Sequence, residues 1–355
     1  MRGAAGGRRV AAMDVGTNTT RLLVVEAGPP GSGGLTELDR RLIFTRLGQG
    51  VDASGRLAPE AIERTVAAIT TFTEIGAGLG VDRVRVAGTS AVREATNRAE
   101  LIAAVRAAAG VELEVIAGEE EAALSFAGAT QDLPAGRYLV CDIGGGSTEL
   151  ASGRTGSAGG PGGPEGSGGP AVPSGPGGPE GPGGPAVPGG PGVPGGPGGP
   201  VLDGGISLPI GVVRITERYH PSDPPTAEEC AAMEAGVDGV LDSAPAALGE
   251  GAVLVGVAGT VTSLAAIHLG LIRYDPAAVH GSFLDAATIA SLYRRLAGMT
   301  NAEREQLAPL PPGRADVIVA GCAILTRVLA RWSFPGVRVS EKDILDGLVL
   351  GILKA

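Results

Sequence analysis

The segment Asp142-Ile143-Gly144-Gly145-Gly146-Ser147-Thr148-Glu149 lies between the apolar residues 138–141 and 150–151. A strand that ends in an acid, a glycine turn with hydroxyls and a second strand together predict a β-hairpin. The backbone N–H groups of such a turn and its small hydroxyls can bind an anion. The acid before the turn is placed to hold a metal ion that partly neutralises the anion.

A shorter form of the same pattern occurs near the N-terminus. Asp14-Val15-Gly16-Thr17-Asn18-Thr19 follows the apolar residues 10–13 and precedes a second apolar strand at 21–26. The two copies open two successive stretches in which predicted strands alternate with predicted helices, which is typical of α/β proteins. We therefore predict a duplicated fold that holds a phosphate chain between its halves.

Composition limits the class of protein. The 355 residues suffice for about two domains, and 43% of them are hydrophobic. No window reaches the roughly 18 apolar residues of a membrane span, so no membrane association is expected. The net charge of −10 argues against a nucleic-acid-binding protein. Three widely spaced cysteines in apolar surroundings predict buried, reduced thiols and hence a cytoplasmic location.

One segment interrupts the α/β pattern. Residues 161–200 contain 18 Gly and 13 Pro, with a repeat offset of 15 residues. Valines stand at positions that a collagen triple helix reserves for glycine, which excludes that structure. We expect residues 153–203 to form a disordered surface loop between two strands of the second domain, with no catalytic role.

Several sequence blocks, taken in order, resemble the exopolyphosphatase / guanosine pentaphosphate phosphohydrolase family. They are the two glycine hairpins and residues 88–97, 115–122, 207–211, 256–264, 314–318 and 340–347. The resemblance implies an α/β fold of the duplicated actin-like (ribonuclease H-like) ATPase type, with an active site in the cleft between two domains. The implied domains are 8–130 plus 336–355, and 131–335. The chain resembles the short form of the family, without the C-terminal helical domain of the larger members.

The resemblance also implies a set of substrate and metal contacts, most of them in the two hairpins. The implied phosphate-binding residues are Gly16, Thr17, Asn18, Arg21, Gly144, Gly145, Gly146, Ser147 and Thr148. The implied Mg2+ ligands are Asp14, Asp142 and Glu149, because hard cations take oxygen ligands, directly or through water.

Catalytic residues are expected just before the second hairpin. Glu119, Glu120 and Glu121 open a predicted helix, where acids also complement the helix dipole. By resemblance, Glu120 is the general base that activates water, and Glu121 is a neighbour that tunes or orients it. Arg93 is the candidate for neutralising charge on the transferred phosphoryl group, and its alternative is a solvent-exposed arginine.

The expected activity is Mg2+-dependent, processive release of terminal phosphate from inorganic polyphosphate, by a protein that the family resemblance suggests is a homodimer. The same residues also suit removal of the 5′-phosphate from guanosine pentaphosphate (pppGpp). Two other classes are a sensor that binds polyphosphate, pppGpp or ppGpp with little turnover, and a small-molecule kinase of the same superfold. The intact glutamate argues against a sensor, and ADP-coupled product formation would identify a kinase.

Overall fold

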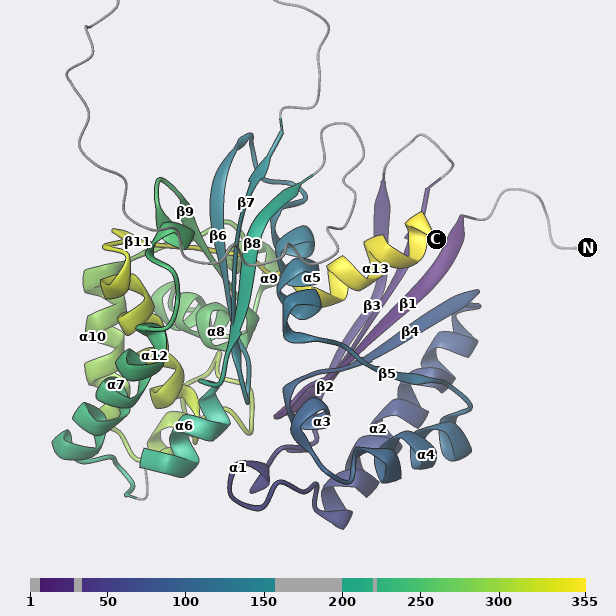
Figure 1. The fold of residues 1–355 in the computed structure, drawn as a ribbon, viewed down its shortest axis with the longest axis horizontal. Coiled ribbons are helices and arrows are strands. Elements are labelled where there is room, and N and C mark those ends of the chain that lie inside the picture. Colours follow the sequence, from purple (N-terminus) through teal and green to yellow (C-terminus); the bar gives the residue numbers. More distant parts are fainter. Residues whose placement is uncertain (1–6, 29–33, 157–199, 220–221) are drawn as a thin grey trace, which may run out of the picture.

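The computed structural model describes residues 7–28, 34–156, 200–219 and 222–355. Two β-sheets stand side by side, each with helices on its faces (Figure 1). The first sheet has the strand order β3-β2-β1-β4-β5. Its strands are β1 (Arg8–Val15), β2 (Thr19–Ala27), β3 (Leu35–Phe44), β4 (Arg83–Gly88) and β5 (Leu113–Val115).

The second sheet repeats this arrangement. Its order is β10-β11-β9-β6-β7-β8, and β6, β7 and β8 form an antiparallel meander as β1, β2 and β3 do. Its strands are β6 (Gly136–Ile143), β7 (Thr148–Thr155), β8 (Val201–Leu208), β9 (Val253–Val257), β10 (Phe283–Asp285) and β11 (Gly336–Val339). Strands β9 and β11 continue it in parallel, as β4 and β5 continue the first sheet. The duplicated α/β fold of the actin-like type is therefore confirmed.

Alternating side chains of the first sheet pack on two helical layers. Ala11, Met13 and Val15 of β1 face the core beneath α2 (Pro59–Gly78) and α4 (Arg98–Ala109). Val10 and Ala12 face the opposite core, beneath α13 (Ile344–Lys354). The period-2 alternation of a strand thus serves both layers with the same apolar run. Two short helices, α1 (Val51–Ser54) and α3 (Ser90–Glu94), complete this half.

The second sheet is covered in the same way. One face packs on α5 (Gly118–Thr130), where Phe126 lies against Tyr138 and Val140 of β6. The other face carries the largest core, built from β6 and the helices of this half. These helices are α6 (Val212–Tyr219), α7 (Ala227–Leu241), η1 (Ala246–Gly249), α8 (Ala258–His268), α9 (Pro276–Val279), α10 (Ala286–Ala297), α11 (Asn301–Glu305) and α12 (Ile318–Arg331).

Helices α5 and α13 lie between the two sheets and pack against each other (Figure 1). Helix α5 packs on β7 and β8, and α13 packs on β1 and β2. The expectation that residues 336–355 complete the first domain as a unit is wrong for the strand, because β11 pairs with β9 and β10 in the second sheet. Only α13 joins the first half.

Most of the Gly/Pro-rich insertion, residues 157–199, lies outside the described residues. The ordered strands reach further into the expected 153–203 loop than the sequence indicates, since β7 continues to Thr155 and β8 begins at Val201. Arg154 and Val201 are register partners, so the insertion joins the ends of two neighbouring strands. In the described residues, none of the helices has both the length and the apolar character needed to cross a membrane.

Candidate active site in the cleft between the sheets

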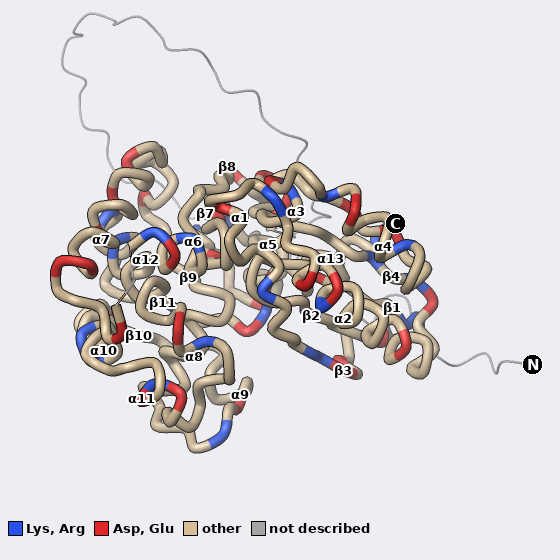
Figure 2. The backbone as a smooth tube through the Cα atoms, turned by 90° about the horizontal axis from the view of Figure 1, so that it is seen from below, with Lys and Arg blue, Asp and Glu red and all other residues tan. Residues whose placement is uncertain are grey.

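A cavity of about 760 Å³ opens between the two halves. Its walls come from the β1–β2 and β6–β7 hairpin turns, the first turns of α8 and α13, the residues before α12, and part of β3. On β3, acidic and basic positions stand side by side (Figure 2). Such a volume is in the range of pockets that bind small molecules.

The two glycine hairpins meet at the bottom of this cavity. A Cβ atom on Gly145 would lie 2.8 Å from Cβ of Thr17, and one on Gly146 would lie 2.5 Å from Oγ of Ser90. These positions therefore require glycine because the facing half approaches too closely for any side chain. The N–H groups of Gly145 and Gly146 form no hydrogen bond to the described part of the chain, and the turn lines the cavity.

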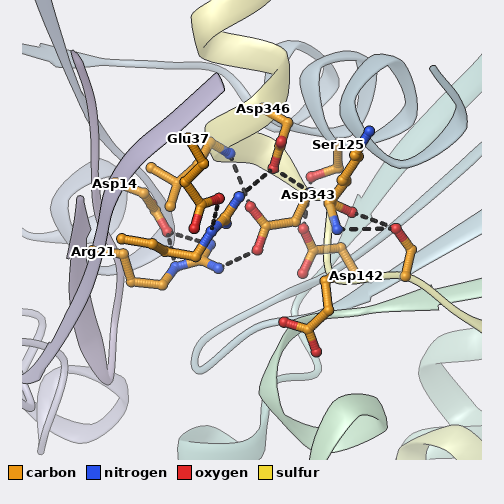
Figure 3. A network of polar contacts seen from close by, with 12 residues as sticks. Asp14, Arg21, Glu37, Ser125, Asp142, Asp343 and Asp346 are labelled. Carbon is orange, nitrogen blue, oxygen red and sulfur yellow. Dashed lines mark hydrogen bonds and ion pairs between the residues drawn. The ribbon is translucent and has the colours of Figure 1, made fainter. Parts of the chain in front are cut away.

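The first hairpin carries an ion-pair network that reaches α13. Asp14 and Arg21 are register partners across the hairpin, and Arg21 Nε and Nη2 donate to Asp14 Oδ2 at 3.0 and 2.6 Å. Arg21 Nη1 donates to Asp343 Oδ2, while Oδ1 of Asp343 caps α13 by accepting from the N–H of Leu345. Figure 3 shows Arg21 between the two carboxylates. Most of the donors of Arg21 are thus engaged with protein carboxylates.

The second hairpin carries two buried acids. Oδ2 of Asp142 accepts from Ser125 Oγ at 2.6 Å, and Oε1 of Glu149 accepts from Ser207 Oγ at 2.7 Å. Burial, with the charge of Asp343, raises the pKa of Asp142 to about 6. Burial, with the charge of Asp142, raises the pKa of Glu149 to about 7. The cleft therefore holds more carboxylates than its arginines neutralise, which favours a bound cation or proton.

Glu121 also lines the cavity, and its side chain is 10% exposed. Arg93 Nη1 donates to Glu121 Oε2 at 2.9 Å and to the carbonyl oxygen of Ile116 at 3.0 Å. Burial, with the charge of Glu149, raises the pKa of Glu121 well above its ordinary value. A carboxyl group with a raised pKa, fixed by an arginine at the wall of a cleft, is the type of group that serves as a general base near neutral pH.

Glu120 does not belong to this group. Its side chain is 44% exposed, and its Oε1 accepts from Arg85 Nη2 at 2.7 Å on the outside of the first half. The prediction that Glu120 contacts the reacting water is therefore corrected. Successive residues of a helix point about 100° apart, so the α5 position that directs Glu121 into the cavity directs Glu120 away from it.

Three other predicted residues have different surroundings from those expected. Arg93 does not line the cavity and instead contacts Glu121, while Arg21 lines the cavity with its guanidinium held by Asp14 and Asp343. Thr148 is fully buried, and its hydroxyl donates to the carbonyl oxygen of Ile210, so it supports the hairpin from behind. The remaining predicted contacts line the cavity: Asp14, Gly16, Thr17, Asn18, Asp142, Gly144, Gly145, Gly146, Ser147 and Glu149.

Asp343 and Arg314 are among the charged residues of the cleft that were not assigned from the sequence. Both line the cavity. Arg314 lies over the ring of Phe44 at 5.8 Å and donates to Ser263 Oγ at 3.3 Å, and burial lowers its pKa to about 10. In the described residues Arg314 has no carboxylate within ion-pair distance, which leaves it available to a ligand anion. Arg314 lies in the block 314–318 and Asp343 in the block 340–347. The family resemblance therefore pointed to both segments, but neither residue was assigned a role.

The acids fit a hydrated cation better than a directly chelated one. In the part of the chain that the structure describes, no three His, Cys, Asp or Glu side chains are grouped closely enough to hold a metal ion directly. Oδ1 of Asp14 is buried without a hydrogen-bond partner, and so is Oγ1 of Thr17. Mg2+ keeps several waters and is commonly bound through one or two carboxylates plus substrate phosphates. An unpartnered carboxylate oxygen beside an anion-binding turn suits that mode.

The chain is similar in sequence and fold to members of a phosphatase family. The sequence profile of the Ppx/GppA phosphatase family matches residues 24–159 and 203–355. "Exopolyphosphatase 2" of Mycobacterium tuberculosis is 37% identical over 97% of this chain and 98% of its own length. The crystal structure of an exopolyphosphatase-like protein superposes with a TM-score of 0.79 at 34% identity, over 98% of this chain and 99% of the other. The Aquifex aeolicus member of the Ppx/GppA family does so with a TM-score of 0.72 at 28% identity, over 98% of both chains.

Proposed function

The chain belongs to the Ppx/GppA phosphatase family, and we propose that it is an exopolyphosphatase. In the proposed reaction, water attacks the terminal phosphorus of inorganic polyphosphate. The bridging P–O bond breaks, and orthophosphate leaves the shortened chain. The observation that carries this proposal is the position of Glu121. Its buried carboxylate stands on the wall of the cavity into which both glycine hairpins point.

Glu121 is the general base in this proposal, in place of Glu120. Its carboxylate accepts the proton of the attacking water, and the raised pKa improves proton acceptance near neutral pH. Arg93 fixes the carboxylate through the 2.9 Å ion pair and keeps part of it ionised against the surrounding negative charge. Only modest assistance is needed because a phosphoanhydride has a good leaving group.

The hairpins hold the terminal phosphoryl group. The N–H groups of Gly145 and Gly146, which have no partner in the described residues, offer donors to phosphate oxygens together with the hydroxyls of Thr17 and Ser147 on the cavity wall. Arg314 is placed to bind phosphates further along the polyphosphate chain, because no carboxylate of the described residues pairs with it.

Mg2+ is the proposed cofactor, held by Asp14, Asp142 and Glu149 through oxygen or bound water. When bound, the cation neutralises charge on the phosphoryl oxygens. Its binding also relieves the repulsion between buried carboxylates that raises their pKa values.

A second candidate is removal of the 5′-phosphate from pppGpp. The observation that favours it is the extent of the cavity beyond the hairpins, along Phe44, Tyr274 and the first turn of α8. An aromatic surface beside a helix N-terminus could accept the nucleoside end while the phosphates occupy the hairpins. ppGpp would then be the product.

The compartment and assembly are part of the same proposal. All three cysteines are free thiols in the structure, which supports a reducing compartment such as the cytoplasm. A homodimer is proposed from the family resemblance. Light scattering on the purified protein measures it directly.

The decisive experiment compares phosphate release from long-chain polyphosphate and from pppGpp in the presence of Mg2+. Wild type is assayed with Glu121→Gln and with Glu120→Gln as the matched control. We expect kcat on polyphosphate to fall about 100-fold or more in Glu121→Gln and to change less than about twofold in Glu120→Gln.

Other outcomes would assign a different function or a different base. Release from pppGpp alone would assign the protein to nucleotide turnover. Tight binding of both substrates without release would indicate a sensor. An equal loss in both glutamine variants would contradict the assignment of the base to Glu121.

A further inference from the structure

The start of α6 receives the second glycine hairpin. The N–H groups of Val212 and Val213 donate to the carbonyl oxygens of Gly144 and Gly145 at 2.9 and 2.8 Å. Nε of Arg214 donates to the next carbonyl oxygen, that of Gly146, at 2.8 Å. Arg214 is thus a side chain bonded directly to the turn that faces the substrate cavity.

The other end of the Arg214 guanidinium contacts the first half of the molecule. Nη1 pairs with Oδ1 of Asp52 in α1, and Nη2 pairs with Oε2 of Glu94 in α3 at 2.6 Å. Asp52 and Glu94 are both linked through hydrogen bonds to segments around the first hairpin. Glu94 accepts from Ser90 Oγ at 3.0 Å. The segment that leads into α1 is tied to the first hairpin by the N–H of Gly48, which donates to the carbonyl oxygen of Thr17 at 2.8 Å.

We propose that Arg214 is a positioning residue that sets the separation of the two glycine hairpins. Its side chain is only 10% exposed, and its three kinds of donor nitrogen contact one hairpin and two acids of the opposite half. A planar guanidinium holds its three partners in a fixed fork geometry, whereas the three donors of an ammonium group rotate about a single nitrogen. Asp52 and Glu94 lie on elements attached to the first hairpin, which keeps their carboxylates within hydrogen-bond distance of Arg214.

This separation bears directly on the reaction, and the inference rests on the proposed hydrolysis in that respect. The terminal phosphoryl group must touch both hairpins while it faces Glu121. A displacement of about 1 Å between groups that hold a reacting atom can lower the rate about 100-fold. Loss of Arg214 should therefore reduce kcat more than it raises KM, because Arg314 and the rest of the cleft still bind the chain.

A neighbouring arginine provides a matched control. Arg218 also pairs with Asp52, through Nε and Nη2, but it is 42% exposed and does not contact the hairpin. If only the ion pair with Asp52 mattered, Arg218→Met and Arg214→Met would have similar effects.

The first measurement is kcat and KM on long-chain polyphosphate for wild type, Arg214→Met, Arg214→Lys and Arg218→Met. We expect Arg214→Met to lower kcat about 30- to 100-fold with KM changed less than about threefold. Arg214→Lys should recover part of the loss, since it keeps one ion pair but not the three-way contact. Arg218→Met should remain within about twofold of wild type.

The second measurement does not depend on activity. Spin labels at Glu63→Cys and Asp242→Cys, one exposed position in each half, report the distance between the halves in a Cys230→Ser background. Wild type should give one narrow distance distribution, and Arg214→Met a broader or shifted one at unchanged helical content. An unchanged distribution, or an unchanged kcat, would overturn the inference. If wild type fails to hydrolyse polyphosphate, the proposed function fails, and the distance distribution still decides the role of Arg214.

Discussion

At the scale of single residues, some side chains of the cleft line the cavity and others support it from behind. Glu121 and Ser147 line the cavity, whereas Thr148, next along the hairpin, is fully buried behind it. Adjacent residues of a strand point to opposite faces, so a hairpin places one hydroxyl toward the ligand and the next toward the core. The sequence identified both residues as hydroxyl donors, but it could not show which of the two side chains faces the ligand.

The two hydroxyls should therefore respond differently to substitution. Thr148→Val keeps the shape of the side chain but leaves the carbonyl oxygen of Ile210 without a donor. We expect it to lower the free energy of unfolding by about 1–2 kcal/mol, with kcat within about twofold of wild type. Ser147→Ala should lower kcat with little change in stability. Urea unfolding and phosphate release measure both effects, and a large loss of kcat in Thr148→Val would restore its predicted contact with phosphate.

The roles of the three glutamates at the start of α5 could not be distinguished from the sequence. Residues 119–121 all satisfy the preference for acids in the first turn, so composition could not distinguish them. The orientation of α5 between two sheets decides which one enters the cleft, and that orientation depends on contacts far apart in sequence. The hairpin acids were predictable because each lies at the end of a strand beside a glycine turn, which fixes its place in the fold.

At the scale of elements, the crossing of α5 and α13 connects the two halves beneath the cleft. A Cβ atom on Gly128 of α5 would lie 1.9 Å from the carbonyl oxygen of Asp343, and one on Gly347 of α13 would lie 2.1 Å from that of Leu124. The helices approach this closely only because neither position carries a side chain. The approach also places Asp343, at the start of α13, against Arg21.

Gly347→Ala should therefore damage both stability and activity. The added methyl group must push α13 away from α5, and we expect a loss of about 2 kcal/mol or more in the free energy of unfolding. The shift of Asp343 should also lower kcat. Gly239→Ala is the matched control, because that glycine lies in α7 and a Cβ added to it would meet no neighbouring atom within 4 Å. Alanine there should stabilise the helix by about 0.5–1 kcal/mol. Thermal unfolding of both variants measures the difference, and equal effects would refute the close-contact explanation.

Element order was largely predictable, while strand partners were less so. The alternation of strands and helices and the two hairpin patterns predicted a duplicated α/β fold, and the sheet topology confirms it. The placement of β11 was missed because a four-residue strand carries no local signal of its neighbour. Strand β11 pairs with β9 because the second sheet repeats the strand order of the first. The chain forms β11, and so completes that order, only after α12.

At the scale of the whole molecule, the buried carboxyl groups between the halves make stability depend on pH and on cations. The pKa of Glu149 is raised to about 7 by burial and by Asp142. The folded state therefore binds a proton that the unfolded state has released above pH ~4.5. The proton therefore stabilises the folded state fully below pH ~4.5, and this stabilisation is lost as pH rises through about 7.

For the metal-free protein we expect the free energy of unfolding to fall by about 2 kcal/mol between pH 5.5 and 7.5 from Glu149 alone. Glu149→Gln should remove that part of the decline, and Mg2+ should stabilise wild type more at pH 7.5 than at pH 5.5. Urea unfolding with a chelator or with Mg2+ measures both. A pH dependence unchanged by Glu149→Gln, or a stabilisation by Mg2+ that is equal at the two pH values, would contradict this account of the cleft.

The insertion at residues 157–199 is attached at a distance from the glycine hairpins. It joins the far ends of β7 and β8, roughly 20 Å along β7 from the hairpin at Thr148. Because Arg154 and Val201 are already register partners, residues 157–199 can be replaced by a short hairpin turn without moving either strand. We expect kcat within about twofold of wild type and an unfolding free energy that rises by up to about 2 kcal/mol, since closing a shorter loop costs less entropy. A loss of kcat of about tenfold or more, with both sheets intact by circular dichroism, would instead give the insertion a part in handling the substrate.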